Sequence, residues 1–199
     1  MKLIFSVLIA YAIWFFLFRV EIFNFWIRFL VSSTILLIIA LLNFKKIIKI
    51  YKPNLKFLKP LFIGLLTGCI FYLLLYAGFY TFKELVYEDA KSVYNLATEI
   101  EPSIIFIILL FTSSCEEIFW RGYVQNSLLN YYGCYKAALL TALIYSSVHV
   151  SSLNISLVFI ALIMGILWGF LYNWSKSLLA VITSHITWTE LVFVILPLT

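Results

Sequence analysis

The sequence contains few charged residues. Only 12% of its 199 residues are Asp, Glu, Lys or Arg, and 64% are hydrophobic. A soluble domain has about 25% charged residues and roughly half apolar ones, so this composition excludes a water-soluble globule, a disordered chain and a nucleic-acid module. The net charge of +5 does not indicate a nucleic-acid partner either, because six of the fourteen basic residues lie in one short stretch between apolar runs, as membrane topology requires.

Cysteine is also scarce and forms no metal or disulfide pattern. Cys69, Cys115 and Cys134 lie in or beside apolar segments without a CxxC pair. This excludes a disulfide framework and a zinc knuckle and predicts three small buried hydrophobic residues. The apolar run at 3–18 precedes Arg19 instead of a small-residue cleavage site, so we predict a retained first helix and not a signal peptide.

Long apolar runs dominate the rest of the chain. A spanning helix needs about 20 apolar residues, because the hydrocarbon core is about 30 Å thick and each residue rises about 1.5 Å. We predict an all-α fold, a polytopic transmembrane helix bundle of about seven spans (six to eight). The runs lie at 3–18, 22–43, 60–82, 103–131, 137–151, 155–174 and 177–197. The first and fifth are short, and the fourth is long enough to tilt strongly or to leave the bilayer.

The loop charges predict the orientation of these spans. Six lysines lie between the second and third spans, namely Lys45, Lys46, Lys49, Lys52, Lys56 and Lys59, and such a loop faces the cytoplasm. They could also bind anionic lipid head groups. The connection 83–101 carries two lysines and five acidic residues, so its net charge of −3 suits the outside. We therefore expect an integral, multi-pass protein of a prokaryotic cell membrane with a cytoplasmic N-terminus.

The two halves of the chain differ in their polar residues. Residues 1–102 are predicted to be N-terminal transmembrane helices with a basic cytoplasmic loop, and Arg28 is the only charge inside those helices. Residues 103–199 are predicted to be the catalytic helix bundle. They hold both histidines of the protein and four charged residues within spans, namely Glu116, Glu117, Arg121 and Glu190. We assign no chemistry to Glu190.

The adjacent glutamates lie where charge is costly. A charged side chain at the centre of a membrane helix costs about 2.5–3.5 kcal/mol, so these groups must face protein or a water-filled cavity. Glu117 and Arg121 are four residues apart and can pair on one helical face. Glu116 is rotated by about 100° from its neighbour and is left unpaired, as a general base requires.

Three motifs follow one another on successive predicted spans: Glu116-Glu117-x-x-x-Arg121, Tyr145-x-x-x-His149 and His185-x-x-x-Thr189. At about 1.5 Å per residue, Glu116 and both histidines lie within about 10 Å of one level of the bilayer. In this order the motifs resemble those of the CAAX protease and bacteriocin-processing family of intramembrane endopeptidases, EExxxR, aromatic-xxxH and HxxxN. The resemblance covers about residues 103–190.

The resemblance implies an intramembrane endopeptidase of the glutamate type. Its substrate would be a peptide or a membrane-anchored protein within the lipid bilayer, and no nucleic acid would be involved. Glu116 would be the general base, His149 would hold or activate the water, and His185 would donate to the oxyanion. Glu117 and Arg121 would support the helix. We expect the cavity to open laterally or toward the cytoplasm.

The sequence departs from the family pattern at Thr189, where the pattern has asparagine. A threonine hydroxyl donates one hydrogen bond but has a shorter reach and no amide, and it can instead bond back to its own helix. The histidines could likewise serve only as hydrogen bonds between helices, and Glu116 could be structural.

Other chemistries and functions stay open. Cys115 could be a thiol nucleophile, although the carboxylate of Glu116 next to it opposes thiolate formation. No cofactor is expected, yet zinc could bind Glu116, His149 and His185, since two histidines and a glutamate form a known catalytic set. The chain could also be a non-catalytic binding or regulatory protein that retains the protease fold. A proton-coupled carrier is a third possibility, but no inverted repeat supports it.

Overall fold

The computed structural model describes residues 2–43 and 57–198. Within these residues the secondary structure is helical and contains no strand. The elements are α1 (Lys2–Arg19), α2 (Phe25–Asn43), α3 (Leu58–Thr81), α4 (Lys83–Ala97), α5 (Pro102–Glu117), a π-helical segment (Ile118–Gln125), α6 (Asn126–Val148), a 3₁₀ turn (His149–Ser152), α7 (Ile155–Ser175), α8 (Leu178–Glu190) and a second π-helical segment (Leu191–Ile195). The all-α helix bundle predicted from the apolar runs is confirmed.

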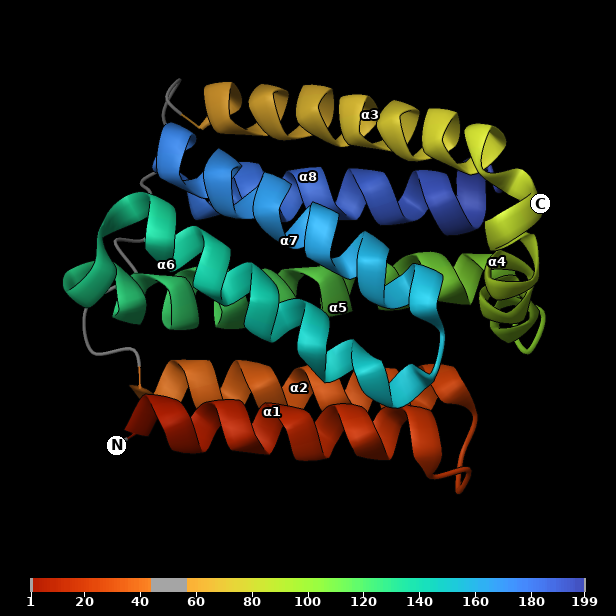
Figure 1. Cartoon of the computed structure of the whole chain (residues 1–199), viewed down its shortest axis with the longest axis horizontal. Coiled ribbons are helices and arrows are strands. Elements are labelled where there is room, and N and C mark those ends of the chain that lie inside the picture. The colour runs from red at the N-terminus through yellow and green to blue at the C-terminus, as the bar shows by residue number, and fades with distance from the viewer. Residues whose placement is uncertain (1, 44–56, 199) are drawn as a thin grey trace.

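Six helical stretches in the described part of the chain are long and apolar enough to cross a membrane. One of them, Pro102–Ser152, has 51 residues and turns back on itself (Figure 1), with a kink at Gly133. Gly133 has φ 72° and ψ 173°, a conformation that a residue without Cβ adopts readily. The described chain therefore passes through the bundle seven times, as predicted, and the protein is an integral multi-pass membrane protein.

The helices are arranged in layers (Figure 1). The α1–α2 pair lies on one side, α3 packs along α8 on the other, and α5, α6 and α7 lie between them. The N-terminus and the ends of α2 and α3 that flank the basic segment lie at one end of the bundle, whereas α4 and the C-terminus lie at the other. Of the six clustered lysines only Lys59, in α3, falls within the described residues.

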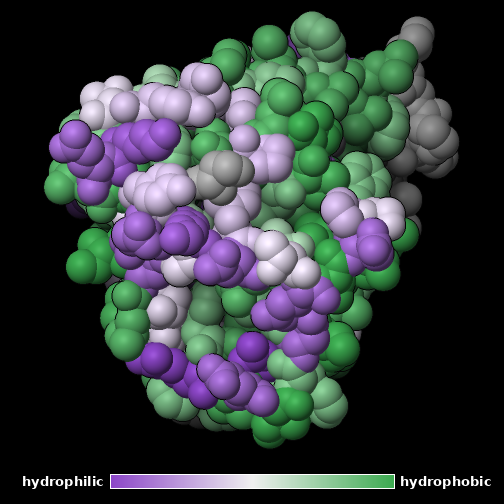
Figure 2. All heavy atoms as spheres, turned by 90° about the vertical axis from the view of Figure 1, so that its right-hand side faces the viewer, coloured by the Kyte–Doolittle hydropathy of each residue, from purple (hydrophilic) through white to green (hydrophobic). Residues whose placement is uncertain are grey.

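The acidic connection, which was predicted to be a loop, contains the helix α4. Asp89 ties this helix to α7, because its carboxylate accepts from the Ser156 backbone N–H at 3.0 Å and its carbonyl accepts from Asn154 Nδ2 at 2.8 Å. The Tyr94 hydroxyl donates to the Val192 carbonyl at 2.8 Å, and burial raises the pKa of Tyr94 to about 12. Figure 2 shows hydrophilic side chains gathered on this end of the molecule.

Two glycines permit the close packing of α3 on α8. A Cβ at Gly64 would lie 2.6 Å from the Ala180 carbonyl oxygen, and one at Gly68 would lie 2.7 Å from that of Ser184. The two glycines are four residues apart and form a small-xxx-small pattern, which is typical of helix contacts in membranes. The α3–α8 interface therefore depends on backbone contact and not on large side chains.

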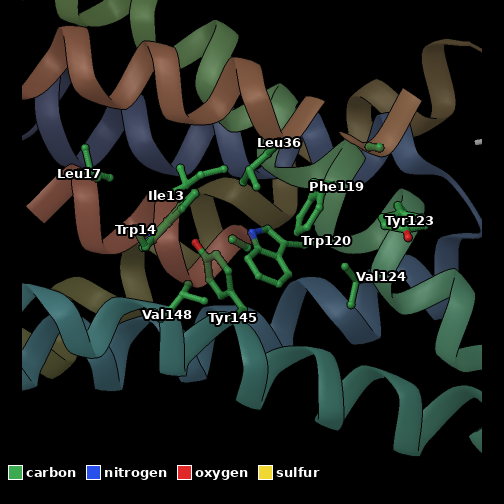
Figure 3. Close-up of a cluster of buried hydrophobic side chains, with 13 residues drawn as sticks. Ile13, Trp14, Leu17, Leu36, Phe119, Trp120, Tyr123, Val124, Tyr145 and Val148 are labelled. Atoms are coloured by element: carbon green, nitrogen blue, oxygen red, sulfur yellow. The ribbon is translucent and has the colours of Figure 1, made fainter. Parts of the chain in front are cut away.

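An aromatic cluster fills the space between α1, α2, the first π-helical segment and α6 (Figure 3). Trp14 comes from α1, Phe119 and Trp120 from the π-helical segment, and Tyr145 from α6. All four are at most 6% exposed. The cluster joins α1 and α2 to the helices that carry the first two motifs. Residues from both halves of the chain therefore pack together in this region.

Candidate active site

A cavity of about 330 Å³ lies within the bundle. Its lining includes exposed residues at the α4 end, such as Glu21 and Ser92, and the buried Glu116, His149 and His185. The cavity therefore leads from the α4 end to the three residues that the motifs single out. That end is opposite the ends of α2 and α3 that flank the basic segment (Figure 1). The expected lateral or cytoplasmic opening of the cavity stays a prediction.

Glu117 is the centre of a buried ionic cluster. Its Oε1 accepts from Arg121 Nη1 at 2.8 Å and from His185 Nδ1 at 2.7 Å, and both Glu117 and Arg121 are fully buried. Arg121 also donates through Nη2 to the Gly165 carbonyl at 3.1 Å. The predicted Glu117–Arg121 pair is thus present, and it joins the EExxxR helix to α7 and α8.

His185 is fixed on both its edge and its face. Its Nδ1 meets Glu117, and its ring stacks on Trp168 with 3.8 Å between the ring centroids. A carboxylate accepts the hydrogen bond, so Nδ1 carries the proton. Nε2 has no hydrogen-bond partner in the described part of the chain. Neutral His185 therefore has an acceptor nitrogen available, and only its imidazolium form can donate from Nε2.

Glu116 points away from this ionic cluster, as the rotation along the helix predicts. The side chain is 4% exposed, lines the cavity, and leaves Oε2 without a hydrogen-bond partner among the described residues. The Tyr145 hydroxyl lies beside the carboxyl group. The π-helical segment begins directly after the two glutamates, and such segments are common at functional sites.

His149 lies at the end of α6 with both ring nitrogens engaged. Nδ1 is 2.7 Å from the Tyr145 carbonyl oxygen, and Nε2 accepts from the Trp14 indole Nε1 at 3.2 Å. The Trp14 and His149 rings meet edge to face with centroids 5.8 Å apart. His149 therefore contributes a fixed wall of the cavity, and a water could bond to its Nε2 only by replacing or sharing the Trp14 bond.

Thr189 bonds back to its own helix. Its hydroxyl lies 3.0 Å from the carbonyl oxygens of His185 and Ile186 and 3.2 Å from the Ser113 hydroxyl. A hydroxyl has one proton, and the carbonyls can only accept it. In this arrangement Thr189 lines the cavity but has no proton left for a substrate oxygen.

The other candidate groups take different positions. Cys115 is buried, but Cys69 and Cys134 are exposed, so the prediction of three buried cysteines is wrong for two of them.

In residues 2–43 and 57–198 no three His, Cys, Asp or Glu side chains are grouped to hold a metal ion. The expectation that no cofactor is required stays a prediction. Glu190 is buried but does not line the cavity.

Two residues of the site, Trp14 and Ser113, were not predicted from the sequence. Both line the cavity and bond to motif residues, Trp14 to His149 and Ser113 to Thr189. Trp14 lies in an apolar helix far from His149 in sequence, so no local pattern predicts the hydrogen bond between them. Ser113 lies three residues before Glu116, and this spacing is the one signal that could have placed both on the same helical face.

Comparison with known proteins finds a similarity to one family in this region. Residues 99–190 match the model of the Rce1-like family, described as type II CAAX prenyl endopeptidase Rce1-like. The match spans all three motifs and confirms the resemblance to the CAAX proteases, a family of intramembrane proteases. No curated protein and no solved structure matches the chain.

Proposed function

We propose that this chain, whose residues 99–190 match the Rce1-like CAAX protease family, hydrolyses a peptide bond of a small or membrane-tethered protein with a water activated by Glu116. One observation carries the proposal: Glu116, with an unpartnered carboxylate oxygen, lines the same cavity as both histidines. Such convergence of titratable groups in a concave site is the usual basis of general acid–base catalysis.

The chemistry requires one proton acceptor and one site for developing negative charge. Glu116 takes a proton from water as the water oxygen attacks the carbonyl carbon. The resulting oxyanion lies in a site shielded from bulk water, where fixed donors act strongly. Protonated Glu116 then gives its proton to the leaving amine nitrogen as the C–N bond breaks, which regenerates the carboxylate and balances the protons.

His185 is the proposed partner of the oxyanion. It donates from Nε2 only as an imidazolium, and Glu117 beside Nδ1 offsets that positive charge. Together with Arg121, Glu117 holds the ring in place. His149 acts less directly than His185, because the Trp14 indole donates to its Nε2. His149 positions the water when that hydrogen bond is released or shared.

Comparative peptidomics of cells that carry wild type or Glu116→Ala tests the proposal. Peptide termini present with wild type and absent with Glu116→Ala, at equal membrane levels of both proteins, would establish proteolysis and reveal the substrate. His149→Ala should abolish the same cleavage. Glu190→Gln is the matched control, because Glu190 is also a buried glutamate but lies away from the cavity, and cleavage should persist.

The alternative is a non-catalytic binding or regulatory protein, favoured by the threonine at position 189. If Glu116→Ala changes no terminus while an active protease of the same family is detected under the same protocol, this alternative replaces the proposal. If Glu116→Ala cleaves normally, Glu116 is not the base.

A further inference from the structure

Ser113 is the middle one of three consecutive hydroxyl residues near the C-terminal end of α5. Its neighbours bond to their own helix, because Thr112 and Ser114 each donate to the carbonyl four residues earlier, at 2.9 and 2.7 Å. The Ser113 hydroxyl instead lies 3.2 Å from the Thr189 hydroxyl and has no other hydrogen-bond partner among the described residues. Ser113 is 2% exposed and, unlike its two neighbours, lines the cavity.

The direction of the Ser113–Thr189 hydrogen bond follows from the number of protons. Thr189 has one hydroxyl proton, and two carbonyl oxygens of its own helix lie 3.0 Å away to accept it. In this bond Thr189 Oγ1 is therefore the acceptor and Ser113 is the donor. Because a hydroxyl proton turns about the C–O bond, Ser113 can direct the same proton to a substrate oxygen in the cavity.

Two contacts between α5 and α8 lie four residues apart on both helices. Ser113 meets Thr189, and Glu117 meets His185 at 2.7 Å. Residue numbers rise along α5 as they fall along α8, so the two helices run antiparallel here. Four residues of helix span about 6 Å, and two hydrogen bonds of about 2.9 Å that end on one oxygen span nearly the same length. An oxygen between the two contacts is therefore within reach of donors from both.

The general base lies on the same face of α5. Glu116 is three residues from Ser113, which places both side chains on one side of the helix, and both line the cavity. When a water activated by Glu116 attacks the carbonyl carbon, the negative charge develops on the carbonyl oxygen one bond away. Donors to that oxygen must lie close to the base, as Ser113 does, and sites for tetrahedral intermediates commonly use more than one donor.

We propose that the Ser113 hydroxyl is a second donor to the oxyanion beside His185, with the substrate oxygen replacing Thr189 as its acceptor. The inference rests on the proposed function and adds a catalytic residue to it. Ser113 keeps its proton and forms no covalent bond. It donates a hydrogen bond while the oxyanion exists and returns to Thr189 when the carbonyl forms again and the C–N bond breaks.

Quantitative peptidomics in cells tests the proposal, with the peptide termini that depend on Glu116 as the readout. Their rate of appearance after induction is compared at equal membrane levels of each variant. Ser113→Ala should lower the rate by about tenfold to a hundredfold, less than the full effect of an oxyanion donor, because the hydroxyl must first leave Thr189. Ser113→Ala/Thr189→Asn should recover most of that loss, since the amide brings N–H donors to the same contact.

Ser114→Ala is the matched control, because it removes a neighbouring hydroxyl that bonds to its own helix and does not line the cavity. It should cleave at the wild-type rate. A Ser113→Ala rate equal to that of wild type, or an equal loss in Ser114→Ala, would overturn the proposal. So would a loss in Ser113→Ala that Thr189→Asn does not relieve, because a purely structural hydroxyl would account for it.

The same experiment separates this inference from the proposed function. Termini that depend on Glu116 but not on Ser113 contradict the role of Ser113 alone. If no terminus depends on Glu116, the proposed function fails, and the role of Ser113 fails with it.

Discussion

The indole N–H of Trp14 donates to Nε2 of His149 across 3.2 Å and thereby joins the first helix of the chain to its second motif. On the other side of the ring, Nδ1 must donate to the Tyr145 carbonyl, 2.7 Å away, because a carbonyl can only accept. The two bonds together select the neutral Nδ1–H tautomer and fix the ring plane. A helix outside the region matched by the family model therefore sets the state of a motif residue.

Replacing Trp14 with phenylalanine should keep the aromatic packing and remove the donor to His149. A net hydrogen bond contributes about 0.5–1.5 kcal/mol, so we expect the cleavage rate to fall by about twofold to tenfold. Nitrogen-15 NMR of the labelled imidazole should show loss of the single Nδ1–H tautomer. Trp26→Phe is the control, because it also removes an indole hydrogen bond at the cavity but should leave the His149 spectrum unchanged.

Replacing Thr189 with asparagine should preserve or raise the cleavage rate. The threonine proton is directed to helix carbonyls, whereas an amide adds N–H donors that could reach the oxyanion. Thr189→Val keeps the shape and removes the hydroxyl, so it should change the rate little. A loss of about a hundredfold in Thr189→Val, the scale of one oxyanion donor, would show that the hydroxyl itself acts on the substrate.

Local patterns in the sequence were sufficient to predict the apolar spanning helices and the Glu117–Arg121 pair. Apolar runs of sufficient length mark spans, and a spacing of four residues brings two side chains together on one helix. The bond between His185 and Glu117, which are 68 residues apart, depends on how helices pack, and no spacing encodes it. The same holds for Trp14 and His149, which are 135 residues apart.

The missed helix α4 has a different cause. Its residues are too polar for a span and carry a net negative charge, so a search for apolar runs assigns them to a loop. Contacts with α7 through Asp89 and with the C-terminal segment through Tyr94 stabilise it at the end of the bundle. Those partners lie at least 60 residues away in sequence, where a local pattern carries no information.

Replacing Glu117 with glutamine should destabilise the protein strongly. Arg121 would remain buried without a counter-charge, and breaking a buried ion pair on one side typically costs about 3–5 kcal/mol. Thermal unfolding in detergent, monitored by circular dichroism, should show the loss. The double variant Glu117→Gln/Arg121→Met removes both charges and should be more stable than the single variant. A single variant as stable as wild type would contradict the view that this pair holds the EExxxR helix in place.

Adding one methyl group at Gly64 should loosen the α3–α8 interface. The Cβ of Gly64→Ala would lie 2.5 Å from the Thr183 Cβ and 2.6 Å from the Ala180 carbonyl oxygen, and overpacking of this kind costs about 1–3 kcal/mol. We expect a lower unfolding temperature. Gly78→Ala is the control in the same helix, because nothing lies within 4 Å of its new Cβ. It should be neutral or stabilising, as alanine favours helices.

The side of the membrane on which the cavity opens follows from the fold together with the loop charges. The cavity leads to the α4 end. The ends of α2 and α3 that flank the basic segment lie at the opposite end, which predicts that α4 faces the outside. After replacement of Cys69 and Cys134 by alanine, Glu88→Cys in α4 should react with a membrane-impermeant maleimide in intact cells. Lys59→Cys at the start of α3 should react only after permeabilisation. The reverse pattern would place the opening in the cytoplasm and make cytoplasmic peptides the accessible substrates.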